Sequence, residues 1–139
     1  MRSSIRNNEI YRIIDANLNR LKEGLRVCEE INRFVLLDRK LTAELKRIRH
    51  EIDNISIGFF NRDKLLKHRE SLKDIGRDIY CPKEFKRNNF KDTFIANIQR
   101  VKESLRVLEE FSKIHDCRAA MRFKKLRYRV YELEKKVSL

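Results

Sequence analysis

The chain has 139 residues, of which 41% are hydrophobic and 40% are charged, and its formal net charge is +13. This length suits one domain with a modest core, and three glycines with one proline favour a helix-rich fold over a disordered chain. The excess of positive charge favours an anionic partner, namely small phosphorylated compounds, a membrane surface or nucleic acid. A basic surface that is simply solvated is the alternative.

The rest of the composition argues against several classes of protein. No apolar run is long enough to span a membrane, and residues 1–8 contain no signal-peptide core. The three cysteines are odd in number and lack metal-ligand spacing, which is typical of reduced thiols. We therefore expect a cytoplasmic protein that does not enter a membrane.

Apolar residues recur every three or four positions from about residue 5 to residue 36, which predicts a long helix. Asp38 is a candidate N-cap for a second helix, and Gly58 is a plausible end for it. The two helices would form a hairpin over about residues 5–57.

The centre of the chain interrupts this pattern over about thirty residues, 58–89, which is longer than a usual connection and indicates a functional segment or a lid. Asp63 could cap a short helix there that ends near Gly76. On that helix Glu70 and Asp74 would share a face. Beside Arg69 they could hold Mg²⁺ and phosphates, or they could belong to an ordinary solvated helix end.

Asn89 or Asp92 can cap a third long helix, at about 90–115, and a fourth follows at about 117–137. No run of alternating apolar and polar residues indicates a strand. The sequence therefore predicts an all-α protein. It would be a helical bundle built from two pseudo-symmetric hairpins, about 5–57 and 90–137, in a single domain over residues 1–139.

An internal repeat supports the pseudo-symmetry. Residues 16–31 align without a gap on residues 96–111, 80 positions later, and ten of the sixteen positions are identical. Most of the identical residues are polar, and the repeat extends over 10–57 and 90–137. Packing explains repeated apolar residues, whereas repeated polar residues indicate a polar task performed twice or from two sides of one site.

Helical geometry places Asn17 inside the apolar stripe of its helix and Arg20 on the border, and Asn97 and Arg100 repeat that placement. A buried asparagine without hydrogen-bond partners costs roughly 1–3 kcal/mol. Two interpretations remain open. The four residues could form a polar network between helices, or they could line a pocket in which the arginines hold an anion.

Residues 12–29 resemble the start of the helical N-terminal domain that is fused to thiamine-phosphate synthase in some bacteria. Residues 41–50, 69–76 and 97–128 are similar to later parts of that domain. The segment 69–76 matches its R-D-[TS]-x-x-D-x-G pattern, except that Glu70 stands where the family usually has Asp. The resemblance covers nearly the whole chain. It implies a kinase that phosphorylates hydroxymethylpyrimidine phosphate to the diphosphate used in thiamine synthesis.

Such a reaction implies ATP as co-substrate and Mg²⁺ as cofactor, with arginines on the phosphates, asparagines on the substrate and carboxylates on the metal. The candidate catalytic residues are Arg20, Arg69, Asp74 and Arg100. The candidate substrate-binding residues are Asn17, Glu23, Arg49, Gly76, Asn97, Glu103 and Arg127. The candidate metal ligands are Asp74 and Glu70.

Three other functions are compatible with the same residues. The chain could be a non-catalytic module that binds or regulates a thiamine-phosphate synthase, or an oligomeric bundle in which the asparagines and arginines only set the pairing. It could also bind nucleic acid, although few aromatics and interleaved acidic residues argue against that. The expected partners are small phosphorylated substrates, with a synthase partner and a homodimer left open.

Overall fold

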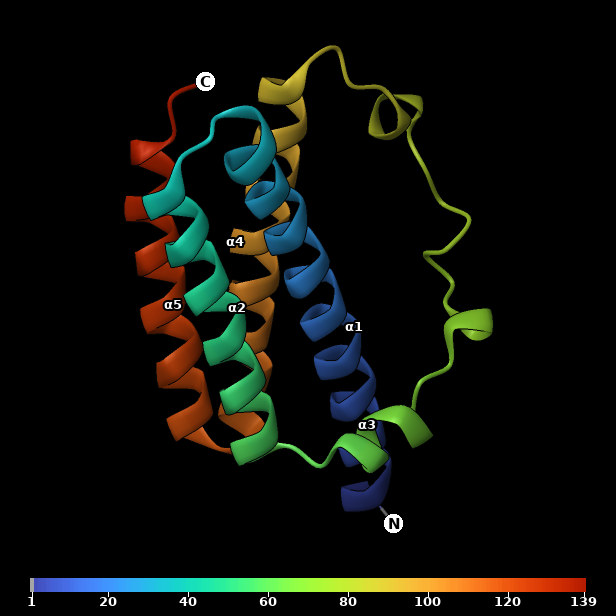
Figure 1. The fold of residues 1–139 in the computed structure, drawn as a ribbon. Helices are drawn as coiled ribbons and strands as arrows, with labels where there is room; N and C mark the ends of the chain where they lie inside the picture. Colours follow the sequence, from blue (N-terminus) through green and yellow to red (C-terminus); the bar gives the residue numbers. More distant parts are fainter. Residues whose placement is uncertain (1) are drawn as a thin grey trace.

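The computed structural model describes the backbone of residues 2–139 and the side chains of residues 7–139. Among these residues the chain forms α-helices and short turns, without a β-strand, which confirms the all-α prediction (Figure 1). The α-helices are α1 (Arg2–Glu30), α2 (Arg39–Phe59), α3 (Arg62–Lys67), α4 (Phe90–His115) and α5 (Cys117–Lys136). None of the described helices combines the length and the apolar character needed to cross a membrane.

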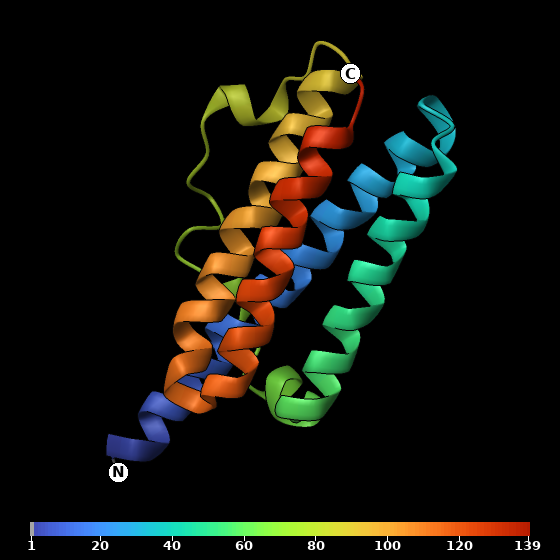
Figure 2. The same cartoon turned by 90° about the vertical axis from the view of Figure 1, so that its left-hand side faces the viewer.

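The four long helices pack as two antiparallel hairpins, α1 with α2 and α4 with α5. The most extensive contacts join α1 to α4, the two helices that carry the repeated sequence. Helices α2 and α5 contact each other on one side of that pair (Figure 2). The bundle therefore has the pseudo-symmetric arrangement that the repeat predicts.

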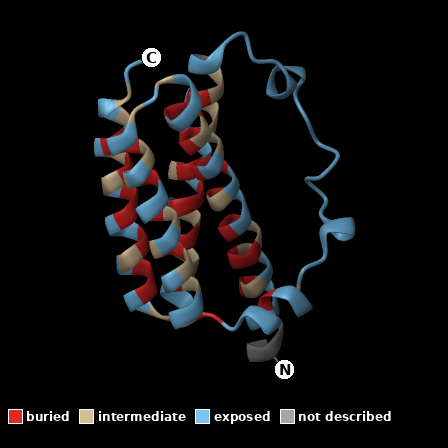
Figure 3. Cartoon of the chain, in the orientation of Figure 1, coloured by how far each residue is buried: buried red, intermediate tan, exposed pale blue. Residues whose placement is uncertain are grey.

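Each long helix contributes one apolar stripe to a common core, and exposed residues cover the outside (Figure 3). The spacing of three or four residues places one side chain per turn on the inner face of each helix. Fully buried members include Ile14, Leu21, Leu25, Leu45, Ile48, Ile52, Ile98, Leu105, Leu108, Phe123 and Leu126. Burial of each such side chain contributes about 1.5–3 kcal/mol, so the stripes hold the helices together.

Side-chain caps fix where several helices begin. Asp38 accepts a hydrogen bond from the backbone N–H of Leu41 at 2.9 Å, and Asn89 accepts one from Asp92 at 2.8 Å. Both caps confirm the prediction. The connection before α2 differs from an ordinary loop, because α1 continues as a π-helical stretch, Ile31–Val35, and Leu37 then adopts a positive φ of 53°.

The predicted central helix from Asp63 to Gly76 is wrong. Helix α3 is capped by Asn61 and ends at Lys67, and the chain then forms two isolated 3₁₀ turns, Ser71–Lys73 and Pro82–Phe85. Past Leu65 the large apolar residues of the segment are exposed, and Leu72 is 84% exposed. Because a short helix needs tertiary packing to persist in water, this stretch does not stay helical.

The segment that connects α3 to α4, residues 68–89, is called the crossover below. Every residue from 69 to 91 is exposed. The crossover arcs away from the bundle beside α1 and α4, on the side opposite α5 (Figures 1 and 2). It touches the bundle closely near its beginning, where it forms the site described next.

Candidate functional site

A groove of about 720 Å³ lies between the outer face of α1 and the start of the crossover. Residues three or four apart on a helix share a face, so Glu9, Arg12, Ala16, Arg20 and Glu23 line it from α1. The crossover supplies the opposite wall. The groove brings together six of the predicted site residues, which are Asn17, Arg20, Glu23, Arg69, Glu70 and Asp74.

A bidentate ion pair joins the two walls. Arg69 donates from Nε to Asp15 Oδ2 and from Nη2 to Asp15 Oδ1, both at 2.7 Å. Asp15 is only 7% exposed, and the side-chain amide of Asn19 donates to its backbone carbonyl at 3.0 Å. The hydrogen bond that Arg69 donates to Asp15 raises the pKa of Arg69 above its ordinary value, so this guanidinium stays charged.

Asp15 is the residue that sequence reasoning missed. It lies outside the apolar stripe of α1, at a position that the helix by itself would leave in solvent, and it is buried because the crossover docks there. Arg12 also lines the groove without having been a candidate. The one signal available for both was their place in the run 12–20, which carries the family resemblance.

The two repeated asparagines do not form a network between helices. Asn17 donates from Nδ2 to the carbonyl of Ile13 at 2.9 Å, and Asn97 donates to that of Thr93 at 2.8 Å. Each amide therefore bonds to the preceding turn of its own helix. Among the described residues no donor reaches Asn17 Oδ1, and this oxygen is available to a ligand in the groove.

The second copy of the motif lies outside the groove. Arg100 and Glu103 are exposed on α4, and Glu103 accepts a hydrogen bond from Gln99 at 3.3 Å. The position that corresponds to Asp15 is Ile95, which is 50% exposed. One of the two interpretations left open by the sequence was a pocket lined by both copies of the motif. The groove does not match it, because Asn97, Arg100 and Glu103 do not line the groove.

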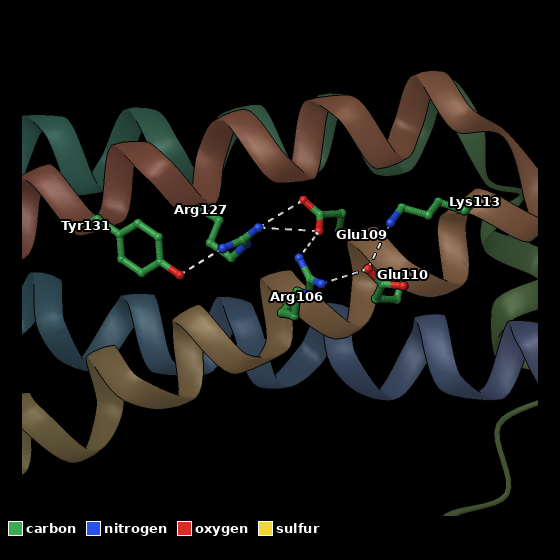
Figure 4. Close-up of polar contacts among 6 residues, drawn as sticks. All are labelled: Arg106, Glu109, Glu110, Lys113, Arg127 and Tyr131. Carbon is green, nitrogen blue, oxygen red and sulfur yellow. Dashed lines mark hydrogen bonds and ion pairs between the residues drawn. The ribbon is translucent and has the colours of Figure 1, made fainter.

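Arg49 and Arg127 also lie elsewhere, in ion pairs within the bundle. Arg49 donates from Nε to Glu29 at 3.0 Å, and Arg127 donates from Nη2 to Glu109 at 3.2 Å. Arg127 further donates to the hydroxyl of Tyr131 at 2.8 Å (Figure 4). Both glutamates have side chains that are only 3% exposed, so the arginines act as counter-ions for buried carboxylates.

The crossover carboxylates are partly engaged. Asp74 accepts a hydrogen bond from the backbone N–H of Gly76 at 2.9 Å, which closes a tight turn, and Glu70 lies 3.7 Å from the ammonium of Lys73. Within residues 7–139, no three His, Cys, Asp or Glu side chains are grouped as a metal cage. Mg²⁺ commonly binds through one or two carboxylates together with substrate phosphates and water. Glu70 and Asp74 fit that kind of site.

The charges that line the groove also favour a divalent cation bound together with phosphates. Its lining contains three arginines and five carboxylates, so its formal charge is negative before a ligand arrives. A phosphate can sit beside the arginines, but several phosphates would face uncompensated carboxylates. A divalent cation bound with the phosphates would remove that repulsion.

Comparison with known proteins agrees with this arrangement. A model of the ThiD2 family matches residues 12–136. A thiamine-phosphate synthase of Nostoc sp. (strain PCC 7120) is 41% identical over 125 residues, which are 90% of this chain and 34% of that protein. A thiamine-phosphate synthase of Thermosynechococcus vestitus is 41% identical over 130 residues, covering 94% and 36%. One of Rhodopirellula baltica is 36% identical over 133 residues, covering 93% and 35%.

The chain spans about a third of the length of these curated relatives. No solved structure matches it. The family model covers α2, α4, α5, the larger part of α1 and the whole crossover, and the match to the Nostoc relative covers 90% of the chain. The chain therefore belongs to the ThiD2 family, whose curated relatives carry names from thiamine biosynthesis.

Proposed function

We propose that this protein is a kinase that transfers a phosphoryl group from ATP to hydroxymethylpyrimidine phosphate and so forms the diphosphate. The observation that carries the proposal is the groove itself. Three arginines from two separate elements, Arg12, Arg20 and Arg69, surround one cavity of about 720 Å³. The family and the names of the relatives restrict the pathway to thiamine biosynthesis.

The chemistry asks little of the protein beyond positioning. The acceptor phosphate is itself the nucleophile, so no strong general base is needed, and the barrier falls through alignment and charge neutralisation. Arg20 and Arg69 would hold phosphate oxygens from opposite walls. The amide oxygen of Asn17 would accept a hydrogen bond from the substrate.

Magnesium would be held between the phosphates of ATP and the carboxylates Glu70 and Asp74, with Glu23 at the edge of the same groove. When bound, the ion neutralises charge on the transferred group. The side chains of α1 bind and orient the acceptor. Glu70 is one methylene longer than the aspartate usual in the family, and we expect Glu70→Asp to retain activity.

A direct assay tests the proposal. The purified protein is incubated with Mg²⁺, ATP and hydroxymethylpyrimidine phosphate, while ADP and the diphosphate are followed. We expect product, and we expect Arg20→Ala to lower kcat/KM by about 100-fold or more, as loss of a transition-state charge contact does. The internal repeat supplies a matched control, because Arg100→Ala removes the equivalent arginine outside the groove and should keep most of the activity.

A second function has one observation in its favour. The curated relatives are thiamine-phosphate synthases of which this unit is only about a third. A non-catalytic module that binds or regulates such an enzyme would explain that association. It predicts no ATP turnover in a folded protein and specific binding to a thiamine-phosphate synthase. Product formation that depends on Arg20 would exclude it as the sole function.

A further inference from the structure

We infer that Asp15 is a positioning residue, which fixes the Arg69 guanidinium so that its remaining donors face an anion in the groove. This inference rests on the proposed function and deepens it. Among the described residues Asp15 is the carboxylate that bonds Arg69, and it does so with both oxygens. A phosphate-binding arginine is useful only when its orientation is set before the ligand arrives.

The geometry divides the guanidinium into two parts. An arginine has five N–H donors, and Asp15 takes one from Nε and one from Nη2. The Nη1 group and the second Nη2 hydrogen remain. The Arg69 side chain is 43% exposed and lines the groove, so these donors are open to a ligand. Asp15 itself is nearly buried, and its role is to hold the arginine.

The internal repeat provides an independent argument. The motif Asn–Arg–Glu occurs in both copies, at 17, 20, 23 and at 97, 100, 103, yet the groove forms over the first copy. The two copies differ at the position two residues before the asparagine, where the first copy has Asp15 and the second has Ile95. An isoleucine cannot hold an arginine from the crossover. The carboxylate thus turns one of two similar helix faces into a site.

The position of Arg69 in the chain makes this contact consequential. Among the described residues, Arg69 is the last of the central region that forms a hydrogen bond or ion pair with α1. Glu70, Ser71 and Asp74 follow directly and form the second wall of the groove. The ion pair between Asp15 and Arg69 therefore sets the orientation of the Arg69 guanidinium. It also sets where the candidate metal ligands Glu70 and Asp74 lie.

The first test does not depend on activity. The side-chain Nε–H signal of Arg69 is observed by NMR in the ¹⁵N-labelled full chain and is assigned by its loss in Arg69→Lys. We expect slow exchange with water in the native protein and fast exchange in the isosteric Asp15→Asn variant. Asp53→Asn is the matched control, because Asp53 pairs with Lys22 of α1 at 2.6 Å and does not line the groove.

Inorganic pyrophosphate is then added as the probe. It should shift the Arg69 signal in the native protein and in Asp53→Asn, and the apparent Kd should rise about tenfold in Asp15→Asn, as for one lost charge-assisted contact. An Arg69 signal that Asp15→Asn leaves unchanged would overturn the inference. So would a native Arg69 signal that pyrophosphate up to millimolar concentration does not move.

Kinetics separate positioning from mere stability. Asp15→Asn and Arg69→Lys should each raise the KM for the acceptor about tenfold, and the double variant should do little more, because both changes remove one shared contact. Arg69→Lys keeps the charge but loses the bidentate geometry. A native protein that shows the NMR response but does not transfer a phosphoryl group would contradict the kinase proposal and leave the positioning role of Asp15 intact. An unchanged acceptor KM in a less stable Asp15→Asn would instead reduce Asp15 to a structural role.

Discussion

Gly24 of α1 lies directly against Val101 of α4 at the point where these helices cross. A Cβ atom at position 24 would come within 3.0 Å of Val101 Cγ2 and 3.1 Å of the backbone oxygen of Asn97. The repeat-equivalent residue, Ser104, is also small and buried. The absence of a side chain at Gly24 lets the two backbones approach closely, and this contact helps to set the distance between the two hairpins.

Gly24→Ala should therefore destabilise the protein, although alanine is the better helix former. We expect a loss of about 1–2 kcal/mol in the free energy of unfolding, because overpacking against a backbone oxygen outweighs the propensity gain. Gly58→Ala is the control, since a Cβ there meets nothing within 4 Å and Gly58 lies in α2. That change should stabilise by about 0.5–1 kcal/mol. Urea unfolding measures both, and equal effects would contradict the close crossing.

Leu37 is a strained position. It adopts φ 53° in the connection before α2, and its side chain is 78% exposed. A left-handed conformation costs a non-glycine residue about 1–2 kcal/mol, and little buried contact offsets that here. Leu37→Gly should raise the melting temperature, whereas the same change at exposed Ile57 within α2 should lower it. A lower melting temperature for Leu37→Gly would show that the conformation is not strained.

The buried Glu109 needs its counter-ion. Arg127→Met removes the charge that lies 3.2 Å away, while the half-exposed Arg106 remains at 2.8 Å. We expect a loss of about 3 kcal/mol in unfolding free energy, since an incompletely paired buried carboxylate is costly. Arg129→Met, which breaks a partly exposed pair with Glu51, should cost about 1 kcal/mol or less. A Glu109→Met/Arg127→Met double variant that is no more stable than Arg127→Met would contradict this explanation.

Asp116 should contribute to acid sensitivity at the α4–α5 turn. Hydrogen bonds from the Arg118 side chain, and then from its backbone N–H, lower the pKa of Asp116 from 3.8 to about 2. A folded-state pKa below the unfolded value stabilises the protein above the unfolded pKa, and that contribution is lost as pH falls from about 4 to about 2. Asp116→Asn should remove this part of the pH dependence. The urea midpoints of the two proteins should separate as pH rises from about 2 to about 4 and keep a constant difference above that. Curves that stay parallel over the whole range from pH 2 to pH 6 would refute the assignment.

Much of the architecture could be predicted from local pattern. The apolar periodicity predicted α1, α2, α4 and α5, and the caps Asp38 and Asn89 were correct, because a helix start depends on neighbouring residues along the chain. The central helix was wrong for the converse reason. Leu65 packs into the core, but the apolar residues after it found no surface to cover, as the exposure of Leu72 shows.

The residues of the candidate site could likewise be predicted only in part from the sequence. The sequence by itself determined the helices, the hairpin pairing and the duplicated motif of asparagine, arginine and glutamate, because these depend on residue types a few positions apart. Only the tertiary structure decided which copy lines a groove, and it did so through one contact, Arg69 on Asp15, between residues 54 positions apart. It also placed Arg49 and Arg127 beside buried glutamates and away from the groove. These contacts depend on where the crossover packs against α1 and on which buried carboxylates need a counter-ion. The helical periodicity of the sequence does not contain that information.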